Sequence, residues 1–91
     1  MIEDRRTPEQ RDQTVAYVVA TDRFMSGWGK APARSLLAIG CASWEQVFDV
    51  ERRMLRHSEM SRVRVNVHLP RIGRGDHLSV VWYESFTYQP S

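Results

Sequence analysis

The sequence predicts one α+β domain with two layers: a four-stranded antiparallel sheet and one helix packed on one of its faces, in the order β-β-α-β-β. Strand-like runs stand before and after a single stretch with helical periodicity. The clearest run, residues 62–69, alternates polar and apolar side chains without a break, as a strand with one buried face does. At 91 residues the chain has room for one core.

The first two strands are expected at residues 14–20 and 35–41, which are short and rich in β-branched and apolar side chains. Their simplest arrangement is an antiparallel pair. The connection between them, residues 21–34, contains Gly27, Gly29 and Pro32, which exclude a regular element there. A connection of this length in a small domain is often functional.

The domain is expected to span residues 14–91, because residues 1–13 are highly charged and contain little to bury. We predict a flexible N-terminal arm there. Thr7-Pro8-Glu9-Gln10 has the chemistry of a capping box with proline at the first helical position. One ordered helical turn is therefore possible within the arm.

The helix is predicted to begin after Ser43, which forms a capping box with Gln46, and to end near His57. Its apolar spacing predicts a buried face. That face comprises Trp44, Val47, Phe48, Met54 and Leu55, with Val50 at its edge.

The last two strands are predicted to form a hairpin around residues 70–75, with residues 77–86 as the fourth strand. If Leu69 pairs with Asp76, Val65 faces Val80, and both are expected to be buried beneath Phe48 and Leu55. The opposite face would then pair Arg62 with Tyr83, Arg64 with Val81, Asn66 with Ser79 and His68 with His77.

The charge of the chain is unevenly distributed. The formal net charge is +2, yet residues 52–77 contain seven arginines and only two acidic residues. The single cysteine, Cys41, cannot form a disulfide framework, which fits a reducing cytoplasm. We see no membrane-length apolar run and no secretion leader, so we expect a cytoplasmic protein without a membrane partner. We also expect it to be a monomer.

A basic row on the outward face of the sheet is the first candidate binding surface. It could engage an anionic partner, with Tyr83 stacking against Arg62 or against a base. The alternative is that a half-exposed strand and a hairpin tip simply carry ordinary solvated side chains. The candidate residues are Arg62, Arg64, Asn66, His68, Arg71, Arg74 and Tyr83.

The glycine-rich connection holds the second candidate. Trp28, between two glycines and followed by Lys30, could anchor a partner. Alternatively, Phe24 and Trp28 fold back as a lid over the open end of the core.

No catalytic arrangement is legible. His68 and His77 lack a third ligand for a metal, and Cys41 reads as a small buried apolar residue. We find no pair of carboxylates and no Ser/His/Asp grouping. We therefore expect no enzyme activity, no cofactor or metal, and no small-molecule substrate.

Residues 21–29, TDRFMSGWG, resemble a signature of small phage and prophage proteins. The resemblance extends through residues 41–45 and the helix to residues 61–65. In size and layout the chain is similar to anti-CRISPR inhibitors of type I systems. Many such inhibitors are acidic DNA mimics, whereas this chain is basic and cannot imitate a phosphate backbone.

The resemblance implies a phage-encoded anti-CRISPR protein that acts in the host cytoplasm. It would bind a type I CRISPR surveillance complex through its basic surface and block target-DNA engagement. The alternative from the residues themselves is a small nucleic-acid-binding module that uses the basic sheet face. The dependence of binding on salt would separate these two classes.

Overall fold

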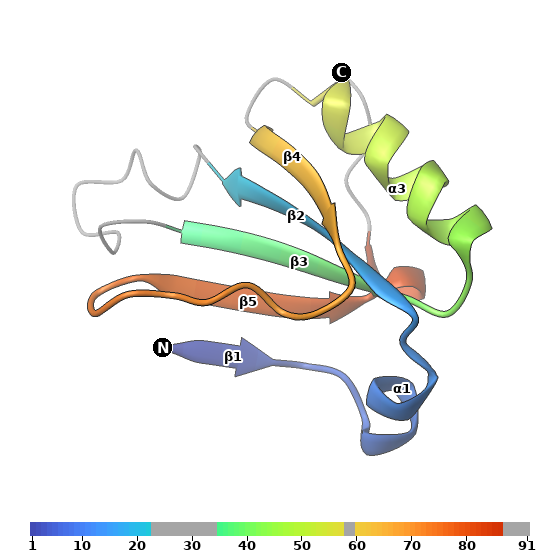
Figure 1. Ribbon diagram of the computed structural model, residues 1–91, viewed down its shortest axis with the longest axis horizontal. Coiled ribbons are helices and arrows are strands. Elements are labelled where there is room, and N and C mark those ends of the chain that lie inside the picture. The colour runs from blue at the N-terminus through green and yellow to red at the C-terminus, as the bar shows by residue number, and fades with distance from the viewer. Residues whose placement is uncertain (23–34, 58–59, 87–91) are drawn as a thin grey trace.

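The computed structural model describes residues 1–22, 35–57 and 60–86 (Figure 1). The predicted α+β class is confirmed, but within these residues the sheet has five strands of mixed direction instead of four antiparallel ones. The elements are β1 (Ile2–Asp4), α1 (Pro8–Gln13), β2 (Ala16–Asp22), β3 (Ser35–Cys41), α3 (Trp44–Leu55), β4 (Met60–Asn66), β5 (His77–Trp82) and the 3-10 turn η1 (Tyr83–Ser85).

The strand order is β1-β5-β3-β2-β4, with β2 antiparallel to both of its neighbours and β1, β5 and β3 mutually parallel. The predicted antiparallel pair of β2 and β3 is confirmed, with Val18 opposite Ile39. The predicted hairpin of β4 and β5 is wrong, since these strands lie on opposite sides of the β2–β3 pair. Val65 pairs with Val18, and Val80 pairs with Ala38.

The composition of β2 and β3 explains this arrangement. Ala16–Ala20 and most of β3 are buried, with no alternation of exposed residues. Strands that are buried on both faces belong in the centre of a sheet. The alternating pattern of β4 and β5 suits either position, because it fixes which face is buried but does not identify the neighbour.

Helix α3 packs over β4 and β2 and covers one face of the sheet. Ser43 caps it as predicted, and Gln46 reaches back to the amide of Ala42 at 2.8 Å. Only part of the predicted buried face is correct: Val47, Val50 and Met54 are buried.

Trp44, Phe48 and Leu55 of the predicted helix core are instead 49%, 59% and 66% exposed. The other side of the helix is held down by polar contacts that sequence spacing does not reveal. Tyr83 donates to Asp49 at 2.8 Å, and Arg53 donates to the carbonyl of Phe86 at 3.1 Å. Those contacts turn Trp44, Phe48 and Leu55 away from the sheet.

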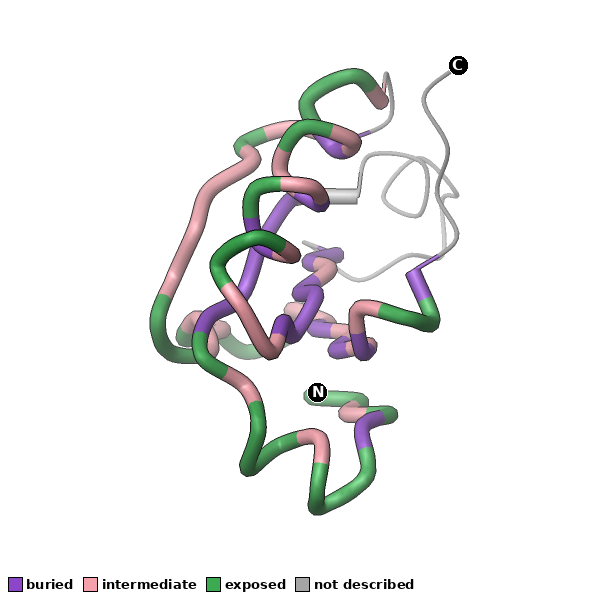
Figure 2. The backbone as a smooth tube through the Cα atoms, turned by 90° about the vertical axis from the view of Figure 1, so that its right-hand side faces the viewer, coloured by how far each residue is buried: buried purple, intermediate pink, exposed green. Residues whose placement is uncertain are grey.

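The second face of the sheet was predicted to be open, and this is wrong. Residues 67–76 run across the sheet from β4 to β5 (Figure 1), and Leu69 and Ile72 pack onto a second core. Figure 2 shows the buried segments concentrated in the sheet, with exposed ones on the outer side of α3. Val80 belongs to this second core and not to the helix side, whereas Val65 is partly buried on the helix side. The second core comprises Tyr17, Val19, Leu36, Ala38, Leu78 and Val80.

The N-terminal residues belong to the sheet, which differs from the loose arm predicted for residues 1–13. Strand β1 pairs with β5, with Ile2 opposite Leu78, and Arg6 is buried. The predicted helical turn is confirmed as α1, with the reciprocal capping box of Thr7 and Gln10. Charge misled the prediction, because the charged side chains here neutralise one another.

Strand β4 carries a β-bulge where it passes β2. Val19 pairs with Arg64 and Thr21 with Ser61, so Arg62 and Val63 together oppose the single residue Ala20. Arg62 has a φ of 55°, a left-handed conformation that disfavours residues with a Cβ atom. The strand at one margin of the described sheet is therefore irregular near its start.

Candidate functional site

The predicted basic row is partly assembled by β4. Arg64 pairs with Val19 and Asn66 with Tyr17, and both partners belong to the second core, so Arg64 and Asn66 lie on the face away from α3. Arg62 is exposed at the bulge. The outward direction predicted for this strand is confirmed for Arg64 and Asn66.

Tyr83 does not join this row, which corrects the expected Arg62–Tyr83 neighbourhood. It lies in η1 and packs with the core beneath α3, where its hydroxyl donates to Asp49. That hydrogen bond lowers the pKa of Asp49 and raises the pKa of Tyr83. Tyr83 therefore positions the helix and is not available for stacking on the basic face.

The remaining cations follow the crossing segment. His68, Arg71 and Arg74 are all exposed. The tip of the segment is shaped by Asp76, whose carboxylate accepts from the amide of Gly73 at 2.9 Å, and by Gly75 with a φ of 88°. The expected pairing of His68 with His77 does not occur, since His77 pairs with Ser35 and contacts Ser79 and Glu3.

We call Arg62, Arg64, Arg71 and Arg74 the basic run. None of the four forms an ion pair with a carboxylate in the described part of the chain. The Arg64 guanidinium instead donates to the carbonyl of Arg62 at 3.0 Å. The four arginines follow β4 and the segment that crosses from β4 to β5, and each guanidinium without a carboxylate partner among the described residues can attract an anionic group.

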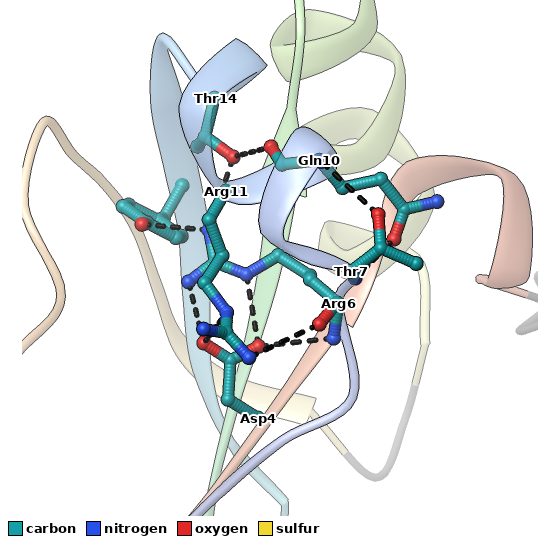
Figure 3. A network of polar contacts seen from close by, with 7 residues as sticks. Asp4, Arg6, Thr7, Gln10, Arg11 and Thr14 are labelled. Atoms are coloured by element: carbon teal, nitrogen blue, oxygen red, sulfur yellow. Dashed lines mark hydrogen bonds and ion pairs between the residues drawn. The ribbon is translucent and has the colours of Figure 1, made fainter.

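Arginines elsewhere in the fold contrast with the basic run. Figure 3 shows Arg6 in the polar cluster of β1 and α1, where it is held by both carboxylate oxygens of Asp4, at 3.0 and 2.7 Å. It also donates to Thr14 and to the Tyr17 hydroxyl, and its guanidinium lies 5.0 Å from the centre of the Tyr17 ring. Arg11 adds a second positive charge 3.5 Å from Asp4.

This cluster is electrostatically satisfied. The hydrogen bond from Arg6 lowers the pKa of Asp4. Burial disfavours the charge on Arg6, but the hydrogen bonds to Asp4 and Tyr17 outweigh it and raise its pKa. The cluster therefore ties the N-terminal residues to the sheet and commits the Arg6 charge to the fold.

The structure also shows a surface that sequence reasoning assigned to the core. Trp44, Phe48 and Leu55 lie along one side of α3, and we call them the apolar stripe; the rings of Trp44 and Phe48 are 6.3 Å apart. Their spacing is typical of the apolar face with which a helix packs against other elements of a protein. The spacing alone could not show that these three side chains are exposed in the described structure.

The structure does not describe the candidate anchor in the glycine-rich connection, and it buries the single cysteine. Trp28 and Lys30 fall outside the described residues. Cys41 is buried beneath α3, and burial raises the pKa of its thiol to about 12, so the thiolate is not populated at neutral pH. Across residues 1–22, 35–57 and 60–86, no three side chains of the metal-binding types come together.

A depression of about 560 Å³ beside the start of α3 is lined partly by Gln46, Asp49 and Tyr83. These side chains already hydrogen-bond within the fold, Gln46 to Ala42 and Tyr83 to Asp49. The depression therefore offers few unsatisfied groups that could orient a small molecule.

Comparison of the chain with protein-family models, with curated proteins and with solved structures finds no match. No helix among the described residues is both long enough and apolar enough to cross a membrane.

Proposed function

We propose that this chain is an anti-CRISPR protein that docks on a type I surveillance complex and blocks target-DNA engagement. The basic run faces carboxylates of that complex near the path by which DNA enters. The chain acts by occupancy alone, as a stoichiometric inhibitor without catalysis. The specific target rests on the phage-like segment TDRFMSGWG, and the mode of binding rests on the geometry of the arginines.

The observation that carries the proposal is that the arginines of the basic run have no carboxylate partner in the described fold. Arginine pairs with carboxylates in a planar, two-point geometry that gives specificity as well as attraction. Long-range attraction between opposite charges raises the rate of association. Carboxylates distributed along the surface of a protein partner would satisfy these groups.

The closed second face favours a protein partner over nucleic acid. A sheet that binds single-stranded nucleic acid presents exposed aromatic rings on which bases stack. Here the corresponding face is covered by Leu69 and Ile72, and Tyr83 lies on the helix side. Phosphate contacts from the arginines remain chemically possible and become an outcome of the test.

The first prediction concerns charge reversal in the basic run. Arg71→Glu should weaken binding to a purified type I complex by about tenfold or more, because attraction becomes repulsion at a charged interface. Arg5→Glu is the matched control: it makes the same change of charge at an exposed arginine just after β1 that already pairs with Glu3 within the fold. It should change affinity by less than about twofold.

Phage plaquing on a host with an active type I system, with and without the gene, tests the biological effect. Unchanged restriction by the host would refute the anti-CRISPR function. Tight, strongly salt-dependent binding to plain DNA or RNA, with no affinity for the complex, would instead assign the basic run to nucleic-acid phosphates.

A further inference from the structure

The apolar stripe and the outer margin of β4 lie on the same side of the molecule. Asp49 and Arg53 mark the side of α3 that contacts Tyr83 and Phe86. At 100° per residue, Trp44, Phe48 and Leu55 fall on the opposite side of the buried residues Val47, Val50 and Met54. Because α3 packs over β4 and β2, that side overhangs β4.

Strand β4 is the last strand in the sheet order, and no described strand pairs with its outer side. Its helix-facing side chains, Val63 and Val65, are only partly buried, and Val67 just beyond the strand is exposed. A margin of this kind presents unpaired backbone amides and carbonyls that can accept another strand. An added strand would lie directly beneath the overhanging apolar stripe.

The two faces of such an added strand would contact different types of side chain, apolar on one face and positively charged on the other. Side chains pointing toward α3 would meet Trp44, Phe48 and Leu55. Side chains pointing the other way would meet the guanidinium of Arg64, with Arg62 beside it at the bulge. Because successive residues of a strand point to opposite faces, the matching segment alternates apolar and acidic residues.

We infer that β4 and the apolar stripe form a docking groove for an extended segment of the partner protein, in which apolar side chains alternate with carboxylates. This inference rests on the proposed function and names the part of the partner that the chain recognises. Backbone hydrogen bonds to β4 supply affinity, and the alternating side chains supply specificity. The carboxylates neutralise the part of the basic run that lies on the strand.

A second copy of the chain fits this groove poorly. Pairing β4 with β4 of another copy would bring Arg62 and Arg64 close to the same arginines, and like charges on adjacent strands repel one another. The left-handed bulge at Arg62 further interrupts the regular ladder that symmetric pairing needs. A segment with carboxylates removes the repulsion.

The groove can be tested directly with a synthetic peptide of about eight residues that alternates glutamate and valine, since strands of this length are typical. Backbone NMR of the full chain should show shifts at residues 63–67 and along α3. A peptide that alternates lysine and valine should bind at least about tenfold more weakly. No shifts with the glutamate peptide, or equal binding of both peptides, would overturn the inference.

The matched variants separate the apolar stripe from general surface hydrophobicity. Phe48→Ser combined with Leu55→Ser should weaken peptide binding about tenfold, because both side chains cover the added strand. Ile2→Ser removes a similarly exposed apolar side chain from β1, at the other margin of the sheet, and should change binding less than about twofold. Equal losses from both changes would count against a groove on α3.

The same variants on the purified type I complex distinguish failure of this inference from failure of the proposed function. Hydrogen exchange at β4 amides should slow when the complex binds, and the Phe48/Leu55 variant should bind weakly. Undiminished binding by that variant with unprotected β4 amides would refute the groove and leave the proposed function standing. Absence of any binding by the unaltered chain would refute the proposed function itself.

Self-association is a further outcome of the experiment. Sedimentation of the chain alone should give a monomer at micromolar concentration. A dimer with β4 amides protected in the absence of peptide would assign the groove to a second copy and overturn the inference.

Discussion

Arg6 and the basic run use the same side chain for opposite purposes. Arg6 is buried, with its side chain 3% exposed, and is held by Asp4, Thr14 and Tyr17. Arg71 and Arg74 are exposed and have no carboxylate partner among the described residues. The first environment fixes the N-terminal residues to the sheet, whereas the second leaves charge available for another molecule.

The contrast shows how to separate structural from binding arginines in a basic chain. A guanidinium that is taken out of water stabilises a fold only when its counter-charge and hydrogen bonds are in place, so its removal or the loss of its partner is costly. A solvated guanidinium contributes little to stability and can be replaced at little cost. Net charge alone does not distinguish the two.

The largest effect expected from this contrast is in the Arg6 cluster. Asp4→Asn should lower the free energy of unfolding by about 2–4 kcal/mol, because it leaves the Arg6 charge buried without a counter-ion. Chemical denaturation measures the change. Glu3→Gln is the neighbouring control: Glu3 pairs with Arg5 at 3.0 Å, but both side chains are largely exposed, so the change should stay within about 0.5 kcal/mol.

The pH profile gives the same prediction a second readout. Because the pKa of Asp4 is lowered in the folded state, its contribution to stability is present above the unfolded pKa and is lost as pH falls through the folded pKa. Asp4→Asn should therefore flatten the loss of stability below about pH 4. Part of the slope should remain, since the pKa of Asp49 is also lowered. Similar profiles for Asp4→Asn and the unaltered chain would contradict a structural role for the pair.

The sequence was sufficient for the local elements. The apolar runs of β2 and β3, the capping box at Thr7 and the N-cap at Ser43 all depend on neighbouring residues, and the structure confirms them. The alternation expected over residues 62–69 is confirmed only in part, because β4 spans Met60–Asn66 and carries a bulge at Arg62 and Val63. The outward direction of Arg64 and Asn66 followed from the same alternation. Period-2 patterning fixes which way side chains point.

The topology could not be predicted in this way. Two strands separated by a short polar segment favour a hairpin, yet here residues 67–76 cross the sheet and bury Leu69 and Ile72 on its second face. Strands β2 and β3 are apolar on both faces and must lie in the centre of the sheet, so β4 and β5 pair with their outer edges. This requirement involves the whole chain and cannot be inferred from the residues next to β4 or β5. Tertiary packing overrode the local preference.

Errors in the predicted topology also led to errors in the predicted binding site. Tyr83 was assigned to the basic face only because the hairpin register placed it beside Arg62. The apolar stripe was assigned to the core because spacing cannot show which of two adjoining helix sides meets the sheet. The hydrogen bonds of Asp49 and Arg53, which orient α3, join residues more than thirty positions apart.

A smaller change in stability is expected at the bulge, where Arg62 combines a left-handed backbone conformation with a positive charge. Arg62→Gly should raise the free energy of unfolding by about 0.5 kcal/mol, because glycine tolerates the left-handed conformation and this gain exceeds its greater freedom in the unfolded chain. Arg64→Gly, on the same strand without a positive φ, should lower it by about 1 kcal/mol. Thermal unfolding compares the pair.

Binding affinity should change in the opposite direction to stability in the Arg62→Gly variant. If Arg62 is retained for its charge, Arg62→Gly should bind the type I complex more weakly while unfolding at a higher temperature. Equal or lower stability of the glycine variant would show that the arginine side chain contributes to the fold and would weaken the separation between structural and binding arginines.

The smallest effect on stability should come from the tip of the crossing segment. Arg71→Ala combined with Arg74→Ala should change the free energy of unfolding by no more than about 0.5 kcal/mol, since both side chains are solvated and neither pairs with a described carboxylate. The same double variant should lose affinity for the complex, most clearly at low salt, where exposed charges attract over longer distances. A drop in stability comparable to that of Asp4→Asn would mean that these arginines also belong to the structure, and the distinction between the two regions would fail.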